Sequence, residues 1–407
     1  MKYCSIFLIV LCLSSCMSLK KGWKLSNHQY ADPFDTRTKP IQKQKQKIYL
    51  LRGVSASNNF PGARLNNFTQ LNDSTFQATI QPENFPINPS PWYAFKLWSN
   101  QEKTIHLKLN YSKHQHRYSP KFSADGQYWK ALDTTLIYVD KSGTNATLKL
   151  NITKDTLWIA SQEIHDTKRV GRWVDSFRNK EGVTIGTAGK SALGKPLYFI
   201  DISKGNPKKK PVIIIISRQH PPEVTGYFAM QSFVETIVKQ GSKNGFLARY
   251  RLLVYPLLNP DGVDLGHYRH NTGGVDLNRD WSQYHQPEIA QITRHMVAEV
   301  ASKKNKVVLG LDFHSTYNDV YYTHDKTVKR KIPDFTKKWL ERIRLKLNLD
   351  RINEQANGTK RPTSSAWFNK QFGATGITYE IGDDTQRDFI TLKGKVSAEA
   401  MMAYFLE

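Results

Sequence analysis

Short runs of alternating apolar and polar residues dominate the chain between positions 48 and 165. In the segments 104–111 and 147–153, every second side chain is Ile, Leu or Tyr, so the apolar side chains share one face. Period-two alternation, with Pro, Asn, Asp and Gly between the runs, predicts antiparallel strands. No long helical pattern interrupts them. Residues 48–165 are therefore expected to form an all-β sandwich of about the size of one immunoglobulin domain.

From residue 168 onward the pattern changes to alternating strands and helices. The continuous apolar run VIIIIS at 212–217 is typical of a strand that is buried on both faces of a helix-covered sheet. Residues 168–407 are therefore expected to form an α/β domain with a mixed sheet. Its predicted strands are 196–202, 212–217, 251–259, 306–313 and 375–380, and its predicted helices are 226–240, 288–302 and 334–347.

The N-terminus carries a different pattern. A positive charge at Lys2 precedes a short apolar stretch, which ends in Leu13-Ser14-Ser15-Cys16 and resembles the lipobox of bacterial lipoproteins. The resemblance implies a signal peptide at 1–15, lipid on Cys16, and a lipidated polar tether at 16–47. It also implies an extracytoplasmic protein that is anchored to the membrane, on the periplasmic face or the cell surface. The alternative is an ordinary signal peptide with an incidental cysteine.

Composition narrows the classes of function. The 407 residues suggest two or three domains, and all three cysteines lie within the first sixteen residues. The body of the protein therefore has neither a disulfide framework nor a cysteine-ligated zinc site. The formal net charge is +24. Because the basic residues are scattered and no nucleic-acid module is recognisable, we expect no nucleic-acid partner. An anionic membrane surface or cell-wall material fits the charge better.

Two motifs that follow predicted strands supply metal-binding side chains. His220-Pro221-Pro222-Glu223 comes after the run at 212–217, and Asp312-Phe313-His314-Ser315 ends the strand 306–313. Catalytic zinc sites commonly use two His and one Glu, and α/β sheets place their sites at such strand ends. Each motif alone is weak, because a lone histidine at a strand end is more often a structural residue.

Arginines and a further acid follow in the same domain. The turn Asn259-Pro260-Asp261-Gly262 precedes Arg269, and the run GVDLNR ends at Arg279. Arginine is suited to bidentate capture of a carboxylate and to stabilising a developing oxyanion. Glu380 closes the apolar strand GITYE and is a candidate general base. The alternatives are arginines on a solvated loop and a glutamate that faces solvent.

In this order, the motifs HPPE, NPDG, YR, GVDLNR, DFHS and TYE resemble the M14 family of zinc carboxypeptidases over residues 168–407. They are most similar to its cytosolic-carboxypeptidase-like branch. The resemblance implies one zinc ion and hydrolysis of C-terminal peptide bonds by metal-activated water. The implied substrate is a peptide with a free C-terminal carboxylate. The implied site consists of the zinc ligands His220, Glu223 and His314, the general base Glu380, the carbonyl-polarising Arg269, the carboxylate-binding Asn278 and Arg279, and Asp276, which accepts from the outer nitrogen of His220.

The chain departs from the family pattern at one position. Many members carry a mobile tyrosine upstream of the glutamate, and an ungapped count places Gly358 there. No tyrosine lies between Tyr322 and Tyr379. Another group caps the peptide nitrogen, or the role is dispensable, or the substrate differs.

The same count suggests a side-chain pocket. Trp367 falls where pancreatic members also carry Trp, and Ser364 and Ser365 fall where members set their side-chain preference. Neither serine is charged or bulky. Lys360 and Arg361 lie nearby and would favour acidic side chains.

Two further functions stay open. Related zinc hydrolases remove acyl groups from amino acids or cut cell-wall peptide amides, and an extracytoplasmic lipoprotein has access to peptidoglycan stem peptides. A non-catalytic binding lipoprotein with a decayed site is the other alternative. The retention of all three ligands and the base argues against it.

Overall fold

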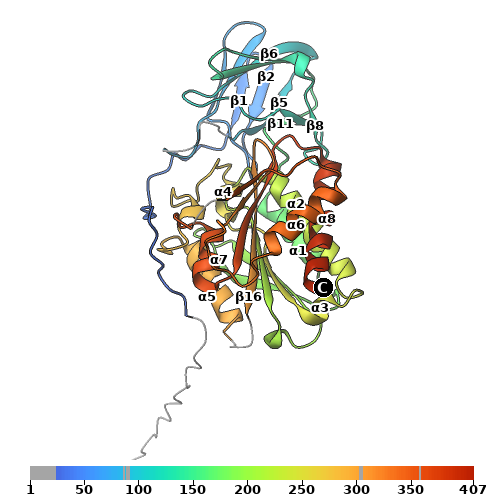
Figure 1. Ribbon diagram of the computed structural model, residues 1–407. Coiled ribbons are helices and arrows are strands. Elements are labelled where there is room, and N and C mark those ends of the chain that lie inside the picture. The colour runs from blue at the N-terminus through green and yellow to red at the C-terminus, as the bar shows by residue number, and fades with distance from the viewer. Residues whose placement is uncertain (1–23, 86–87, 89–91, 302–305, 357–358) are drawn as a thin grey trace, which may run out of the picture.

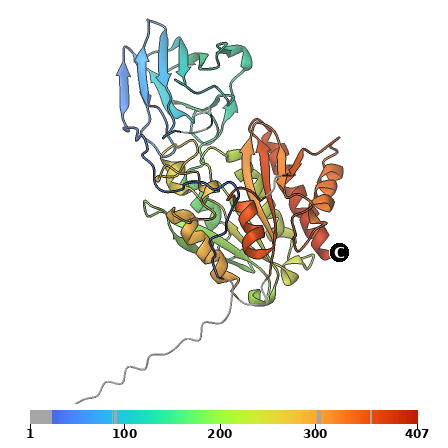
Figure 2. The same ribbon diagram turned by 60° about the vertical axis from the view of Figure 1, so that its left-hand side comes forward.

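The computed structural model describes residues 24–85, 88, 92–301, 306–356 and 359–407. Its first domain is a sandwich of two sheets that lies at one end of the second domain, as Figures 1 and 2 show. One sheet has the order β1(Ile48–Leu51), β2(Val54–Ser57), β5(Ala94–Ser99), β11(Leu157–Ala160), β7(Lys121–Ser123), β8(Lys130–Ala131). The other has the order β3(Asn67–Gln70), β4(Thr75–Thr79), β6(Lys103–Asn110), β10(Asn145–Ile152), β9(Ile137–Val139).

The alternating pattern explains the sandwich core. Strands β6 and β10 match the expected segments 104–111 and 147–153 and pair antiparallel, with Leu107 opposite Leu148. Both of these side chains are fully buried between the sheets. The polar residues between them point outward, as period-two alternation requires.

The second domain is built on one mixed sheet. Its order is β12(Val183–Lys190), β13(Pro196–Ile202), β15(Arg251–Tyr255), β14(Val212–Ser217), β16(Val307–Thr316), β19(Thr375–Gly382), β17(Val320–Thr323), β18(Glu354–Ala356). The central strands β15, β14, β16 and β19 run parallel to one another. The helices are α1(Thr167–Asp175), α2(Val224–Gln240), α3(Phe246–Arg249), α4(Pro260–Asp264), α5(Pro287–Glu299), α6(Phe335–Lys346), α7(Ser364–Phe372) and α8(Arg387–Leu406). The predicted fold class, an all-β sandwich followed by a mixed-sheet α/β domain, is confirmed.

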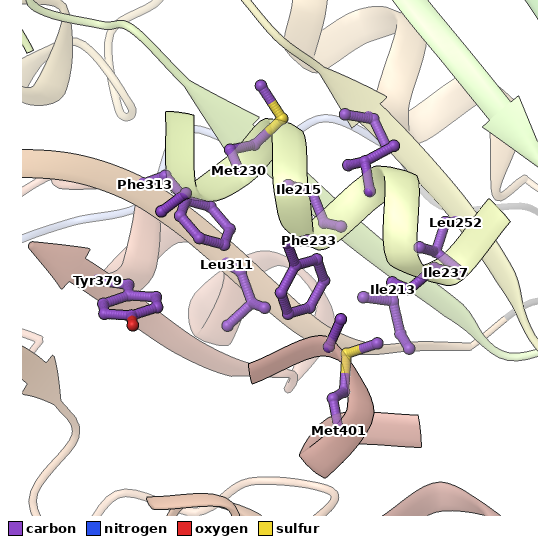
Figure 3. Packing of buried hydrophobic residues seen from close by; sticks show 14 of the residues in the cluster. Ile213, Ile215, Met230, Phe233, Ile237, Leu252, Leu311, Phe313, Tyr379 and Met401 are labelled. Carbon is purple, nitrogen blue, oxygen red and sulfur yellow. The ribbon is translucent and has the colours of Figure 1, made fainter. Parts of the chain in front are cut away.

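Helices cover both faces of this sheet. On β14, Ile213 and Ile215 pack with residues of α2, α6 and α8, and Figure 3 shows Met230, Phe233 and Met401 in this layer. The alternate residues of β14 pack on the other face with residues of α5 and α7. The apolar run at 212–217 is therefore buried on both sides, as the sequence predicts.

One strand is shorter than expected. The predicted strand 251–259 ends at Tyr255, as β15. Pro256 follows directly, and because proline has no backbone N–H it cannot continue the ladder.

The described part of the expected tether, residues 24–47, lies along the second domain (Figure 1). Thr36 is buried, and its hydroxyl donates to Asp280. Backbone hydrogen bonds join Lys39 N to the Gly273 oxygen (2.8 Å) and Asp32 N to the Lys360 oxygen (2.9 Å). The sequence predicts a polar tether here, and loops of the second domain supply hydrogen-bond partners for residues 24–47. Residues 24–47 therefore form part of the folded body.

The signal peptide and Cys16 lie outside the described residues, so lipid attachment stays a prediction of the sequence. Within the described ranges, the helices are all too short or too polar to cross a bilayer.

Ion pairs join the sandwich to loops of the second domain. Arg117 Nε lies 2.7 Å from Asp383 Oδ2, and both side chains are more than nine-tenths buried. Glu163 binds the guanidinium of Arg387 through both carboxylate oxygens, at 2.7 and 2.8 Å. Asp383 directly follows β19. The sandwich thus contacts the edge of the sheet at which the parallel strands end.

Candidate active site

The candidate site lies at the carboxyl ends of three neighbouring parallel strands. His220 and Glu223 follow β14. His314 lies near the end of β16, and Glu380 lies near the end of β19. His314 and Glu380 are paired in register across β16 and β19. Because parallel strands end at the same edge of a sheet, these four side chains converge.

A glycine allows the first helix of the site to approach closely. Helix α2 begins at Val224, directly after Glu223. A Cβ atom on Gly226 would lie 2.2 Å from the backbone oxygen of His314. The backbone N–H of Gly226 also donates to Ser315 Oγ at 2.8 Å. The absence of a side chain at Gly226 therefore lets α2 hold Glu223 beside His314.

His220, Glu223 and His314 present three ligand atoms to one point. Glu223 Oε1 lies 2.7 Å from His220 Nδ1, and Oε2 lies 2.6 Å from His314 Nδ1. The three ligand atoms all lie within 4.8 Å of one another. Two imidazole nitrogens and one carboxylate are the donor set of catalytic zinc sites. These residues fit a zinc ion.

Carboxylates hold the outer nitrogens of both histidines. His220 Nε2 lies 2.9 Å from Asp276 Oδ1, and His314 Nε2 lies 2.8 Å from Asp312 Oδ2. Such contacts set the tautomer that leaves the inner nitrogen as a ligand. No role was expected for Asp312 from the sequence. Its spacing of two from His314 on one strand, which places both side chains on the same face, was the available signal.

The electrostatics of the cluster favour a cation. Burial alone would lower the pKa of His314, but the carboxylates of Asp312 and Glu223 raise it well above its usual range. Burial also lowers the pKa of His220, and the carboxylate of Glu223 raises it. The pKa of His220 is raised as a result. A divalent ion between these groups would meet the same negative potential, because the carboxylates are fixed by the fold.

Glu380 is half-buried, and its Oε2 atom is shielded from solvent. Burial, together with the negative charge of Glu223, raises its pKa to about 7. Its Oε2 atom has no hydrogen-bond partner among the described residues. A carboxyl with a shielded, unpaired oxygen at a pocket can accept or release a proton.

Asp276 joins the metal cluster to the arginines. Its Oδ1 accepts from the backbone N–H of Asn278 (2.9 Å) as well as contacting His220. Its Oδ2 accepts from Arg269 Nε at 2.9 Å and lies 2.8 Å from Arg269 Nη2. Arg279 Nη1 lies 4.0 Å from the same oxygen. One carboxylate thus orients a metal ligand and a guanidinium together.

A pocket of about 550 Å³ opens beside the cluster. Asn278 and Arg279 line it, and the side-chain oxygen of Asn278 accepts from the backbone N–H of Ser364 at 2.9 Å. This contact leaves the amide NH₂ of Asn278 available as a donor. Lys360, Arg361 and Ser365 also line the pocket, whereas Ser364 donates its hydroxyl to Asp312 behind it.

The position of the missing tyrosine, Gly358, lies outside the described residues. Three other tyrosines line the pocket: Tyr118 from the sandwich, Tyr268 from the loop before Arg269, and Tyr322 from β17. Burial raises the pKa of Tyr118 well above its usual range, so its phenol stays protonated. Tyr118 was not among the residues expected at the site, and the sandwich was expected to contribute no chemistry. No local pattern marks a side chain that reaches a site in another domain.

The chain has low sequence identity to cytosolic carboxypeptidases. The chain is 23% identical over 287 residues to bovine cytosolic carboxypeptidase 3, covering 63% of this chain and 28% of that protein. It is 33% identical over 143 residues to cytosolic carboxypeptidase 2 of Danio rerio, covering 32% of this chain and 20% of that protein. The chain thus spans under a third of the length of these two relatives.

Solved structures share the fold, including the sandwich. The metallo-carboxypeptidase of Burkholderia cenocepacia superposes with a TM-score of 0.73 at 16% identity, covering 86% of this chain and 99% of that one. The metallo-carboxypeptidase of Pseudomonas aeruginosa, in complex with (2-guanidinoethylmercapto)succinic acid, gives a TM-score of 0.71 at 17% identity, covering 86% and 100%.

The sequence profile of the zinc carboxypeptidase family matches residues 171–403, more than half of the chain. This match spans the strands and loops that carry the His-Glu-His cluster, and the donor set agrees with it. The chain belongs to the M14 family of zinc carboxypeptidases, with His220, Glu223 and His314 as its zinc site.

Proposed function

We propose that the protein is a metallocarboxypeptidase that releases single residues from the C-terminus of peptides. The observation that carries this function is the convergence of three elements in one pocket. These elements are the His-Glu-His cluster, the carboxyl of Glu380, and the cationic wall that Arg269 and Arg279 provide. Zinc bound at the cluster would supply Lewis-acid activation of a water molecule and of the scissile carbonyl.

Glu380 acts as the general base and then as the general acid. Its unpaired Oε2 takes a proton from the attacking water and returns it to the leaving amine. A pKa near neutrality suits both directions of transfer, because the carboxyl then gains and loses a proton at little cost in free energy.

Arg269 stabilises the oxyanion that forms from the carbonyl oxygen. Asp276 binds its Nε and one side of Nη2, so Nη1 and the second N–H of Nη2 are left as donors for the substrate. The guanidinium is oriented before the substrate arrives, and such preorganised donors stabilise developing charge effectively.

Asn278 and Arg279 hold the α-carboxylate of the terminal residue. The amide NH₂ of Asn278 and the guanidinium of Arg279 provide donors on one wall of the pocket. Because this wall lies at a set distance from the metal cluster, only the last peptide bond is placed for attack. Specificity for a chain terminus follows.

The pocket favours an acidic terminal side chain. Lys360 and Arg361 line it and are exposed to solvent, and Asp32 of the N-terminal segment holds Arg361 Nε at 2.7 Å. Because exposed charge pairs are worth about 0.2–1 kcal/mol, the preference for Glu or Asp should be about two- to fivefold.

A matched pair of peptide libraries tests this function. One library has free C-terminal carboxylates and the other has the same sequences as C-terminal amides, and products are identified by mass spectrometry. We expect single-residue release from the free acids, with acidic residues enriched. Release from the amides should be about 10²-fold slower, since charge-assisted hydrogen bonds contribute about 1.5–3 kcal/mol each.

Other product patterns would contradict the proposal. Cleavage of internal bonds at equal rates in both libraries would exclude an exopeptidase. Peptidoglycan stem peptides, assayed in parallel, should be cut no faster than free peptides with the same terminal residue. A strong excess of stem-peptide cleavage would favour a cell-wall amidase instead.

We also propose, from the Leu13–Cys16 pattern, that lipid on Cys16 anchors the protein to a membrane outside the cytoplasm. Replacing Cys16 with serine should move the protein from the membrane fraction to the soluble fraction. Retention of the variant in the membrane fraction would contradict this anchor.

A further inference from the structure

A buried glutamate of the sandwich lies directly under the loop that carries Arg269. Glu83 follows strand β4, and its side chain is fully buried. Its carboxylate accepts hydrogen bonds from three consecutive backbone N–H groups, those of Tyr268 (2.8 Å), Arg269 (3.0 Å) and His270 (2.6 Å). The two oxygens of Glu83 thus bind the main chain of the arginine on both sides.

Further contacts from the sandwich hold the same loop. Asn84 Nδ2 donates to the Gly274 oxygen at 3.0 Å, and Asn84 Oδ1 also contacts His270. On the other side, Gly266 has a positive φ of 64°, and a Cβ there would lie 2.2 Å from the Ala63 oxygen. The loop is therefore pressed against the sandwich at both of its ends.

The carboxylate of Glu83 stays charged although it is buried. Burial would raise its pKa, but the neighbouring His267 and His270 and the backbone N–H groups lower it below its usual value. Without this acceptor, three buried N–H groups would lose their partner. Each unsatisfied group costs about 1–3 kcal/mol, so the loop would rearrange.

The two ends of Arg269 are thus held from different domains. Asp276 of the catalytic domain fixes its guanidinium, and Glu83 of the sandwich fixes its backbone. We propose that Glu83 is a positioning residue, through which the sandwich holds Arg269 where it can stabilise the oxyanion. This inference rests on the proposed function, and it assigns the sandwich a part in the chemistry.

Contacts other than those of Glu83 also join the two domains. Arg117 pairs with Asp383 and donates to the Tyr268 hydroxyl, whereas Glu163 pairs with Arg387 and does not contact the arginine loop. Loss of the Glu83 charge should therefore loosen the arginine loop without separating the domains. This separation of roles provides a matched control.

The test uses the full chain with Glu83→Gln, which keeps the size of the side chain but replaces one acceptor oxygen with a donor. We expect kcat to fall by about 10- to 100-fold, with KM within about threefold, because small displacements of a catalytic group can cost up to about 10²-fold. Glu163→Gln, which removes an interdomain charge elsewhere, should keep kcat within about twofold. Zinc content should equal that of the wild type in both variants.

Two measurements separate positioning from general destabilisation. In an Arg269→Ala background, Glu83→Gln should lower kcat by less than a further factor of about two. The effects of residues that act through one another are not additive. Hydrogen exchange should show faster exchange of the Tyr268, Arg269 and His270 amides in Glu83→Gln than in Glu163→Gln. Glu83→Asp, which shortens the side chain, serves as the second variant if the glutamine variant does not fold.

Equal protection of these amides in Glu83→Gln and wild type would overturn the inference, and so would an unchanged kcat. If Glu83→Gln lowers kcat by the same factor in the Arg269→Ala background as in the wild type, the inference is also overturned. Inactivity of the wild type on both peptide libraries would instead reject the proposed function. The hydrogen-exchange result would still decide whether Glu83 holds the loop.

Discussion

Replacing Glu380 with glutamine should lower kcat by about 10²- to 10⁴-fold and leave zinc bound, since general acid–base catalysis contributes about that factor. Glutamine has nearly the same shape but cannot take a proton from water at neutral pH. The ligand atoms belong to His220, Glu223 and His314, so the metal content should not change. Peptide hydrolysis under saturating substrate, together with metal analysis, measures both expectations.

A matched variant at the far end of the sheet controls for charge loss. Glu299 pairs with Arg251, which begins β15 at the edge opposite the site. Glu299→Gln should therefore keep kcat within about twofold, because the pair lies away from the site and Arg251 keeps its second partner, Asp201. Unchanged kcat in Glu380→Gln would remove Glu380 from the role of base. Loss of zinc in that variant would show that Glu380 supports the metal site instead.

Removing the metal with a chelator should abolish hydrolysis, and adding zinc should restore it. Without a cation, His220 and His314 hydrogen-bond to Glu223, so the cluster has no electrophile. The domain should stay folded, because its cores on both faces of the sheet do not include these ligands. The midpoint of thermal unfolding should fall, since a ligand that binds only the native state stabilises it.

Asp312→Asn provides a graded version of this experiment. Its carboxylate fixes the outer nitrogen of His314, and removal of such support typically costs about 10- to 100-fold in metal affinity. The concentration of chelator that abolishes hydrolysis should therefore be about 10- to 100-fold lower for the variant than for the wild type. Hydrolysis that persists after metal analysis shows an empty site would contradict a metallopeptidase.

The local patterns carried much of the fold. The apolar run at 212–217 predicted a strand with both faces covered, because only such a strand can be apolar at every position. The alternation at 104–111 predicted a sandwich strand for the corresponding reason. The prediction for 251–259 was too long, since hydrophobicity does not report the missing N–H of Pro256.

The sequence by itself determined the identity of the metal ligands. His220 and Glu223 are close in the chain and follow a buried strand, and His314 ends another. Parallel strands end at the same edge of a sheet, and the strand order places β14 beside β16. The chemistry of the donor set is therefore present in the order of the motifs.

Only the tertiary structure decided which segments outside the second domain support its loops. Glu83 lies 186 positions before Arg269, and Thr36 lies 244 positions before Asp280. Neither pair has a periodicity or motif, because a contact between domains depends on surfaces and not on local spacing. The sandwich and residues 24–47 looked like separate parts in the sequence. Packing against the catalytic loops makes them part of the site, since buried backbone N–H groups there need acceptors that the loops themselves do not contain.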